Sequence, residues 1–162
     1  MTARDRLQSR LRTTSTGAAA SAPLPLPGWA RWIVRLAGAG LLGAMAGIHL
    51  HLYQLGYSTV STIGPLFLLN GVVGSVAAAV VLLAPARWLP VASAGGALLQ
   101  IGTLLGLVLS LTVGLFGFSE TPGAPLVGWT FAVESAGFLV LAAHAGYEGR
   151  PLVASLRGRN RP

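Results

Sequence analysis

Long apolar segments alternate with short polar ones along the whole chain. The apolar segments cover residues 32–54, 63–84, 91–116 and 126–147, and each exceeds the ~18 apolar residues that mark a membrane span. A helix rises about 1.5 Å per residue, so each segment can cross the ~30 Å hydrocarbon layer and satisfy its own backbone hydrogen bonds. The pattern predicts an all-α membrane four-helix bundle in up-down-up-down order.

Short loops divide the chain into a compact core and two tails. We predict a transmembrane domain over 29–148, a basic and then flexible tail over 1–28, and a second basic tail over 149–162.

The loop sequence LGYS at 55–58 resembles FGFS at 116–119, and each is followed several residues later by Pro-Leu. Either the chain consists of two duplicated hairpins, or this similarity between apolar sequences arose by chance.

Composition and charge agree with a membrane protein. Hydrophobic residues make up 53% of the chain and charged residues 9%, against about 25% charged in soluble domains. The net charge is +7, and every basic residue is an arginine on one side of the predicted topology. Under the positive-inside rule both termini are cytoplasmic, and the Arg-rich tails meet anionic headgroups of the lipid bilayer. These arginines are Arg4, Arg6, Arg10, Arg12, Arg31, Arg35, Arg87, Arg150, Arg157, Arg159 and Arg161.

The same composition narrows the classes of function. The arginines do not form a binding face for nucleic acid, so none is predicted as a partner. The chain has no cysteine, which excludes disulfides and thiolate metal sites. Arginine as the sole basic residue, with abundant Ala, Gly and Leu, indicates a GC-rich bacterial genome and hence a bacterial plasma membrane.

Small residues recur at four-residue spacing within the spans. Such faces let helix backbones approach closely in lipid, where no hydrophobic force drives helices together. We therefore expect these stripes to form the interior of the bundle. The helix-packing glycines predicted in this way are Gly43, Gly47, Gly74, Gly102, Gly106 and Gly114.

Six strongly polar residues fall inside the spans, where each is costly and needs a partner or a purpose. From their positions along the predicted spans, four of them lie in the outer half of the membrane. Gln100 lies near the middle, and His144 lies near the cytoplasmic face. The outer cluster fits a proton relay, a cation site or a pocket for a polar ring such as a quinone; it also fits a hydrogen-bond network that only orients the helices. The four outer residues are His49, His51, Asn70 and Glu134.

Geometry limits what the histidines can do. His49 and His51 point about 200° apart on one helix, so at most one can meet Glu134, and the stripe of Gly43 and Gly47 favours His51. Two facing axial histidines for haem are not supplied, and no pair within the cluster has metal-ligand spacing. We predict no cofactor and no metal.

The segments HLHLY at 49–53 and IGPLFLLN at 63–70 resemble those of a group of uncharacterised small four-span bacterial integral membrane proteins. The chain also has the general look of DoxX-like four-helix proteins. This resemblance covers the spans and not the tails, and implies the fold but no function.

No catalytic motif is present, so an enzyme is not supported. The first hypothesis is a non-enzymatic accessory or interaction subunit, associated with other membrane subunits or with its own copies. The alternatives are a proton- or quinone-linked redox component that uses the His/Glu cluster, and a small oligomeric transporter.

Overall fold

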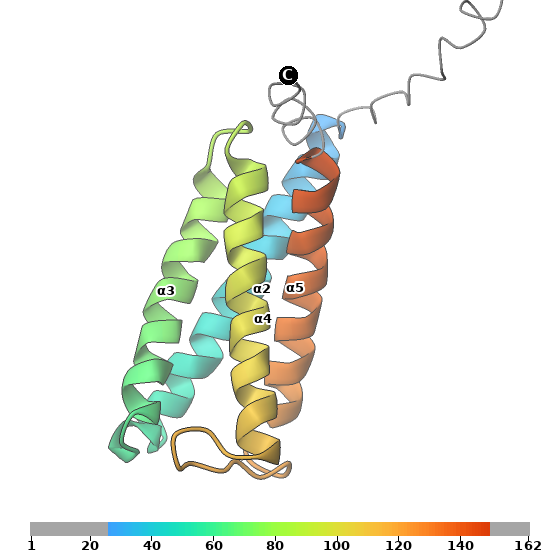
Figure 1. Ribbon diagram of the computed structural model, residues 1–162. Coiled ribbons are helices and arrows are strands. Elements are labelled where there is room, and N and C mark those ends of the chain that lie inside the picture. The colour runs from blue at the N-terminus through green and yellow to red at the C-terminus, as the bar shows by residue number, and fades with distance from the viewer. Residues whose placement is uncertain (1–25, 150–162) are drawn as a thin grey trace, which may run out of the picture.

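The computed structural model describes residues 26–149, which form a bundle of long helices and contain no strand (Figure 1). All four long helices are long and apolar enough to cross a membrane, so the prediction of an all-α membrane four-helix bundle is confirmed. The tail segments 1–25 and 150–162 lie outside the described residues. The helices are α2 (Gly28–Gln54), α3 (Ile63–Leu83), α4 (Leu89–Thr112) and α5 (Val127–Glu148), and a 3-10 helix, η1 (Tyr57–Thr59), follows α2.

The bundle has two distinct ends. The first residue of α2, the last residue of α5 and the turn at 84–88 share one end, here called the terminal end (Figure 1). η1 and the loop at 113–126 form the opposite loop end. α2 packs mainly against α3, and α4 mainly against α5. α3 and α4 meet near the 84–88 turn and diverge toward the loop end (Figure 1).

α4 is shorter at the loop end than its apolar sequence predicts. It ends at Thr112, four residues before the predicted limit of 116. Gly114 has a φ of +84°, which favours glycine and stops a right-handed helix, and Phe116 also has positive φ. Leu115 and Phe118 then exchange backbone hydrogen bonds in a tight turn. Gly114, predicted as a helix-packing residue, therefore ends the helix instead.

A leucine layer forms the centre of the bundle. Leu42 of α2 and Leu141 of α5 are both fully buried. Leu141 packs against two neighbouring helices at once, because a Cβ on Gly38 would lie 2.6 Å and one on Gly96 3.0 Å from its methyl carbons. These glycines allow three helices to converge on a single leucine.

Most of the predicted packing glycines do not pack. A Cβ on Gly43, Gly47 or Gly102 would meet nothing within 4 Å, and one on Gly106 would meet only Leu115, at 3.9 Å. Among the predicted set, Gly74 makes the expected close approach, since a Cβ there would lie 2.9 Å from the terminal methyl group of Met45. Lipid tolerates small residues on the outer surface, where Gly43 and Gly47 lie, so the four-residue spacing alone does not identify a packing face.

Candidate functional site

The site begins with the inner face of α2. The buried positions of this helix recur every three or four residues, so one stripe faces the other helices. His49 lies on this stripe and its side chain is almost wholly buried. Its Nδ1 lies 2.9 Å from the carbonyl oxygen of Met45. Because a carbonyl only accepts, Nδ1 carries the hydrogen, and in a neutral ring Nε2 is left as an acceptor.

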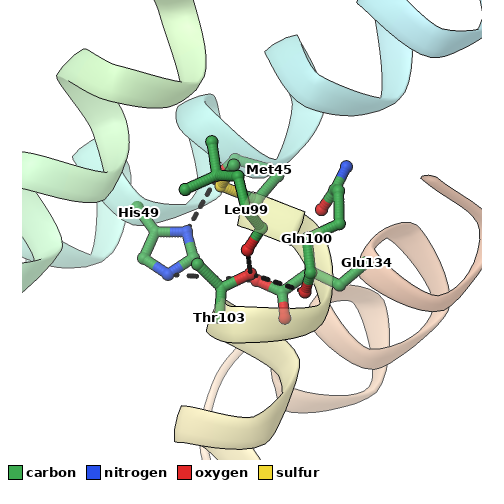
Figure 2. Close-up of polar contacts among 6 residues, drawn as sticks. All are labelled: Met45, His49, Leu99, Gln100, Thr103 and Glu134. Carbon is green, nitrogen blue, oxygen red and sulfur yellow. Dashed lines mark hydrogen bonds and ion pairs between the residues drawn. The ribbon is translucent and has the colours of Figure 1, made fainter. Parts of the chain in front are cut away.

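The second member of the site is Glu134 on α5. Its side chain is fully buried, and Oε1 lies 4.0 Å from Nε2 of His49. Figure 2 shows the imidazole and the carboxyl reaching toward one another from different helices, with Thr103 of α4 beside them. Three helices therefore supply one compact polar group in the interior of the bundle.

Several atoms of this group have no hydrogen-bond partner within residues 26–149. They are both carboxyl oxygens of Glu134 and both amide atoms of Gln100, which is also fully buried. Thr103 uses its hydroxyl hydrogen on the backbone, with acceptors at Leu99 (3.2 Å) and Gln100 (2.9 Å). Its oxygen can still accept. Buried polar atoms without partners are rare in folded proteins and cluster where chemistry or binding takes place.

The structure separates the two histidines that the sequence placed in one cluster. The side chain of His51 is exposed on the outer surface of α2, on the same stripe as Gly43 and Gly47. The preference for His51 as the partner of Glu134 is therefore wrong, and His49 takes that place. The reason is the misassigned glycine stripe, which faces outward and takes His51 with it.

A cavity of about 360 Å³ adjoins the pair, on the loop-end side. His49 forms part of its wall, together with Asn70 of α3 and Thr103, so two of the four predicted site residues line it. Most of the remaining wall is apolar, and leucines and phenylalanines from α3, α4 and the 113–126 loop form its largest part. Gly102 and Gly106, predicted as packing residues, line the cavity, which explains the open space beside them.

A row of aromatic rings extends from His49 to the loop end. Phe67 lies 5.1 Å from the imidazole, and Tyr57 stacks on Phe67 at 4.8 Å with 19° between the ring planes. The edge of the row is Phe118, which meets Tyr57 at 5.9 Å and 68°. Tyr57 and Phe118 occupy matching positions in the two similar loop sequences, and the glycine before each has positive φ. The duplication itself stays a prediction.

A hydrogen bond holds this end together. The hydroxyl of Tyr57 donates to Oε2 of Glu120 at 2.5 Å, which joins η1 to the 113–126 loop. Burial raises the pKa of Tyr57 above its usual value, and the hydrogen bond and negative charge of Glu120 raise it further. Neither residue was predicted as part of the site, because a loop position gives no sign in the sequence of what it will contact.

The remaining membrane histidine belongs to another layer. His144 is buried near the terminal end, where its Nδ1 lies 3.0 Å from the hydroxyl of Ser93. The leucine layer of Leu42 and Leu141 lies between it and Glu134 along the helices. Within residues 26–149 no group of three or more His, Cys, Asp or Glu could hold a metal ion.

The fold and the site together define a class: an integral membrane protein of four helices with a buried imidazole–carboxyl pair beside an internal cavity. No protein-family model, curated protein or solved structure matches the chain.

Proposed function

We propose that this membrane protein binds a small lipid-soluble molecule in the cavity and exchanges protons with it through His49 and Glu134. It would thus act as a proton- or quinone-linked component of the membrane. The observation that carries the proposal is the 4.0 Å approach of a fully buried carboxyl to an imidazole that forms part of the cavity wall. A polar group in that position is costly in lipid unless it serves a ligand or a proton path.

The cavity suits a ligand that is mostly apolar. Its volume of about 360 Å³ falls within the range of roughly 300–1,000 Å³ for small-molecule pockets. Polar residues are a minority of its lining, and His49, Asn70 and Thr103 are among them. The side chain of Asn70 makes no hydrogen bond within residues 26–149. A ring that carries one or two carbonyl or hydroxyl oxygens, such as a quinone ring, would meet these groups while its tail lies among leucines.

The pair can hold one proton in two places. At rest the carboxyl of Glu134 keeps the proton, since an isolated carboxylate in an apolar interior is strongly disfavoured. Transfer of that proton to Nε2 of His49 gives a carboxylate and an imidazolium, and the imidazolium can donate a hydrogen bond to a carbonyl oxygen of the ligand. The proton passes fully to that oxygen only when the ring has taken up electrons from a separate electron donor, since an oxidised quinone oxygen is a very weak base. The hydrogen bond from Nδ1 to Met45 keeps the ring in the orientation that this transfer needs.

A route into the cavity from the lipid follows from the shape of the bundle. α3 and α4 pack less extensively than the other neighbouring pairs and diverge toward the loop end (Figure 1). The cavity is lined by both helices there, with Phe67 of α3 and Leu107 of α4 among its walls. A lipid-soluble molecule would enter between them without crossing water.

Two glycines of α4 provide a matched test. Gly106 lines the cavity, whereas Gly95 does not, and a side chain at either position meets no close atom. In nanodiscs, a short-chain benzoquinone analogue should raise the melting temperature of the parent and of Gly95→Leu. The leucine side chain of Gly106→Leu fills the cavity, so the analogue should no longer raise the melting temperature of this variant. Equal stabilisation of Gly106→Leu and Gly95→Leu would exclude the cavity as the binding site.

The proton-exchange step has its own test. Proton uptake or release on binding of the analogue is followed with a pH indicator in weakly buffered nanodiscs. Glu134→Gln keeps the shape of the side chain but cannot titrate, so it should bind the analogue and exchange no proton. Proton exchange by this variant equal to that of the parent would remove Glu134 from the mechanism.

We place the protein in a bacterial plasma membrane with both termini in the cytoplasm. The support is the distribution of arginine: Arg31, Arg35 and Arg87 all lie at the terminal end, and neither loop at the opposite end contains a basic residue. The cavity would then open in the outer half of the membrane.

A second candidate function is that of an accessory subunit, and the outer face of α2 favours it. Gly40, Gly43 and Gly47 are exposed there with nothing within 4 Å, and His51 follows them. Such a face fits the close approach of another membrane helix, in a second copy or another subunit. Gly47→Cys in this cysteine-free chain should form a disulfide-linked dimer on mild oxidation if copies meet there. Ala143→Cys, on the exposed face of α5, is the control.

A further inference from the structure

Arg35 is a buried arginine without an acidic partner in the described part of the chain. Only 9% of the residue is exposed, and it forms no ion pair among residues 26–149. Its Nη1 donates to the carbonyl oxygen of Leu82 at 2.9 Å. Its guanidinium also lies 5.5 Å from the ring of Trp32. This hydrogen bond uses one of the five N–H donors of the guanidinium.

The sequence contains few acidic residues that could neutralise the charge of Arg35. It contains four acidic residues, of which Glu120 lies at the loop end and Glu134 pairs with His49. Glu148 is at the terminal end, but it is bonded to Arg31 at 3.1 Å. The fourth, Asp5, lies outside the described residues. The carbonyl end of α3 offsets about half a charge at most, so the group around Arg35 keeps a net positive charge.

The depth of Arg35 is fixed by its hydrogen bond. Leu82 is the second-last residue of α3, a helix of 21 residues that spans about 31 Å, close to the ~30 Å hydrocarbon layer. A helix of this length that crosses the membrane would place the guanidinium where the hydrocarbon layer ends and the lipid phosphates begin. Trp32 (59% exposed) lies beside it, and Trp29 (70% exposed) lies at the start of the same helix, as aromatic residues do at this boundary.

We propose that Arg35 binds the phosphate of an anionic phospholipid in the leaflet at the terminal end, with the Trp32 ring against the lipid. The planar fork of a guanidinium matches phosphate oxygens, and a negative headgroup supplies the charge that residues 26–149 lack. The other ionisable side chains at the terminal end, within residues 26–149, are Arg31, Arg87, His144, Tyr147 and Glu148, and Arg31 and Glu148 neutralise each other.

The surroundings fit a lipid better than a free anion. A soluble phosphate would leave the exposed indole of Trp32 uncovered, whereas the glycerol and upper acyl chains of a phospholipid would cover it. The site lies at the opposite end of the bundle from the cavity. The lipid proposal and the proposed function can therefore fail independently of each other.

The test compares lipid compositions. The parent protein is reconstituted in nanodiscs of phosphatidylcholine with and without phosphatidylglycerol, and its melting temperature is measured. We expect phosphatidylglycerol to raise it, and Arg35→Gln to lose most of this rise. Arg87→Gln is the control, because Arg87 is an exposed arginine at the same end with no partner among residues 26–149. Loss of the rise in both variants would mean general surface attraction and would overturn the proposal.

Two further arms separate the remaining outcomes. Inorganic phosphate is added to phosphatidylcholine nanodiscs; a rise equal to that from phosphatidylglycerol would assign the site to a free anion and overturn the lipid proposal. Native mass spectrometry of the parent in mixed lipid needs no variant, in case Arg35→Gln fails to fold. Preferential retention of phosphatidylglycerol that Arg35→Lys weakens supports the site, whereas no preference in the parent contradicts it.

Discussion

Gln100 of α4 lies directly against the backbone of Gly137 of α5, so that a Cβ at position 137 would collide with the Gln100 amide. Both residues are buried, and the amide of Gln100 has no hydrogen-bond partner within residues 26–149. Its position is therefore fixed by packing alone. Gly137 lies one turn from Glu134, which means that this contact also sets how α5 presents the carboxyl to the site.

Gly137→Ala should destabilise the bundle, because the added methyl group must displace either the Gln100 side chain or the helix. Overpacking of this kind costs about 1–3 kcal/mol. We expect a lower melting temperature in detergent and in nanodiscs. Gly128→Ala on the same helix, where a Cβ meets nothing within 4 Å, should leave stability unchanged. An unchanged melting temperature for Gly137→Ala would show that α4 and α5 do not approach as described.

Glu134 should couple energetically to His49 and not to His51. In a double-mutant cycle with Glu134→Ala, His49→Ala should give an interaction energy of about 0.5–3 kcal/mol. His51 is exposed, so His51→Ala should be additive with Glu134→Ala within about 0.5 kcal/mol. Stability is measured by reversible unfolding in detergent. Coupling to His51 in place of His49 would reverse the assignment of the inner face of α2.

Alkaline pH should weaken the loop end through Tyr57. A raised pKa means that the folded protein holds the phenolic proton more tightly than the unfolded chain does, so the stabilisation is complete below about pH 10. It is lost as pH rises above that value. Tyr57→Phe removes the group and should flatten the fall in melting temperature on the alkaline side. Tyr53→Phe, whose hydroxyl has no partner among residues 26–149, should keep the fall of the parent.

The proposed topology can be read by cysteine labelling, since the chain has no native cysteine. Ser58 and Ser119 are exposed at the loop end. As single cysteines they should react with a membrane-impermeant reagent in intact cells. Ser9→Cys and Ser155→Cys, in the two tails, should react only after permeabilisation. Labelling of either tail in intact cells would place the terminal end outside.

The sequence predicted the helices well and their inner faces poorly. Length and hydropathy identify a span because the bilayer demands both. They cannot say which side of it faces protein, because lipid tails are as apolar as a leucine core. Gly43 and Gly47 illustrate this: a regular row of small residues was assigned to the interior, and the structure places it outside.

Polar residues were the better guide. On α5, Glu134, Gly137, Leu141 and His144 follow one another at spacings of three or four, and all are buried. A face drawn through the two ionisable residues would have found the two packing residues between them. The same rule, applied to α2, would have selected the face that contains His49. The cavity and the contact of Tyr57 with Glu120 could not be predicted in this way, because they depend on where separate segments meet.

The divergence of α3 and α4 has a mechanical consequence. These two helices are joined by a short turn at the terminal end and packed loosely at the loop end. Sideways compression of the bundle therefore moves them first at the loop end. The stress that acts there is the lateral pressure of the surrounding lipid chains. Tightly packed saturated lipids would push α3 toward α4 and narrow the space between them, whereas loosely packed unsaturated lipids would let it widen. Affinity for the benzoquinone analogue should then differ between bilayers of the two kinds, so that the physical state of the membrane would itself regulate occupancy of the cavity.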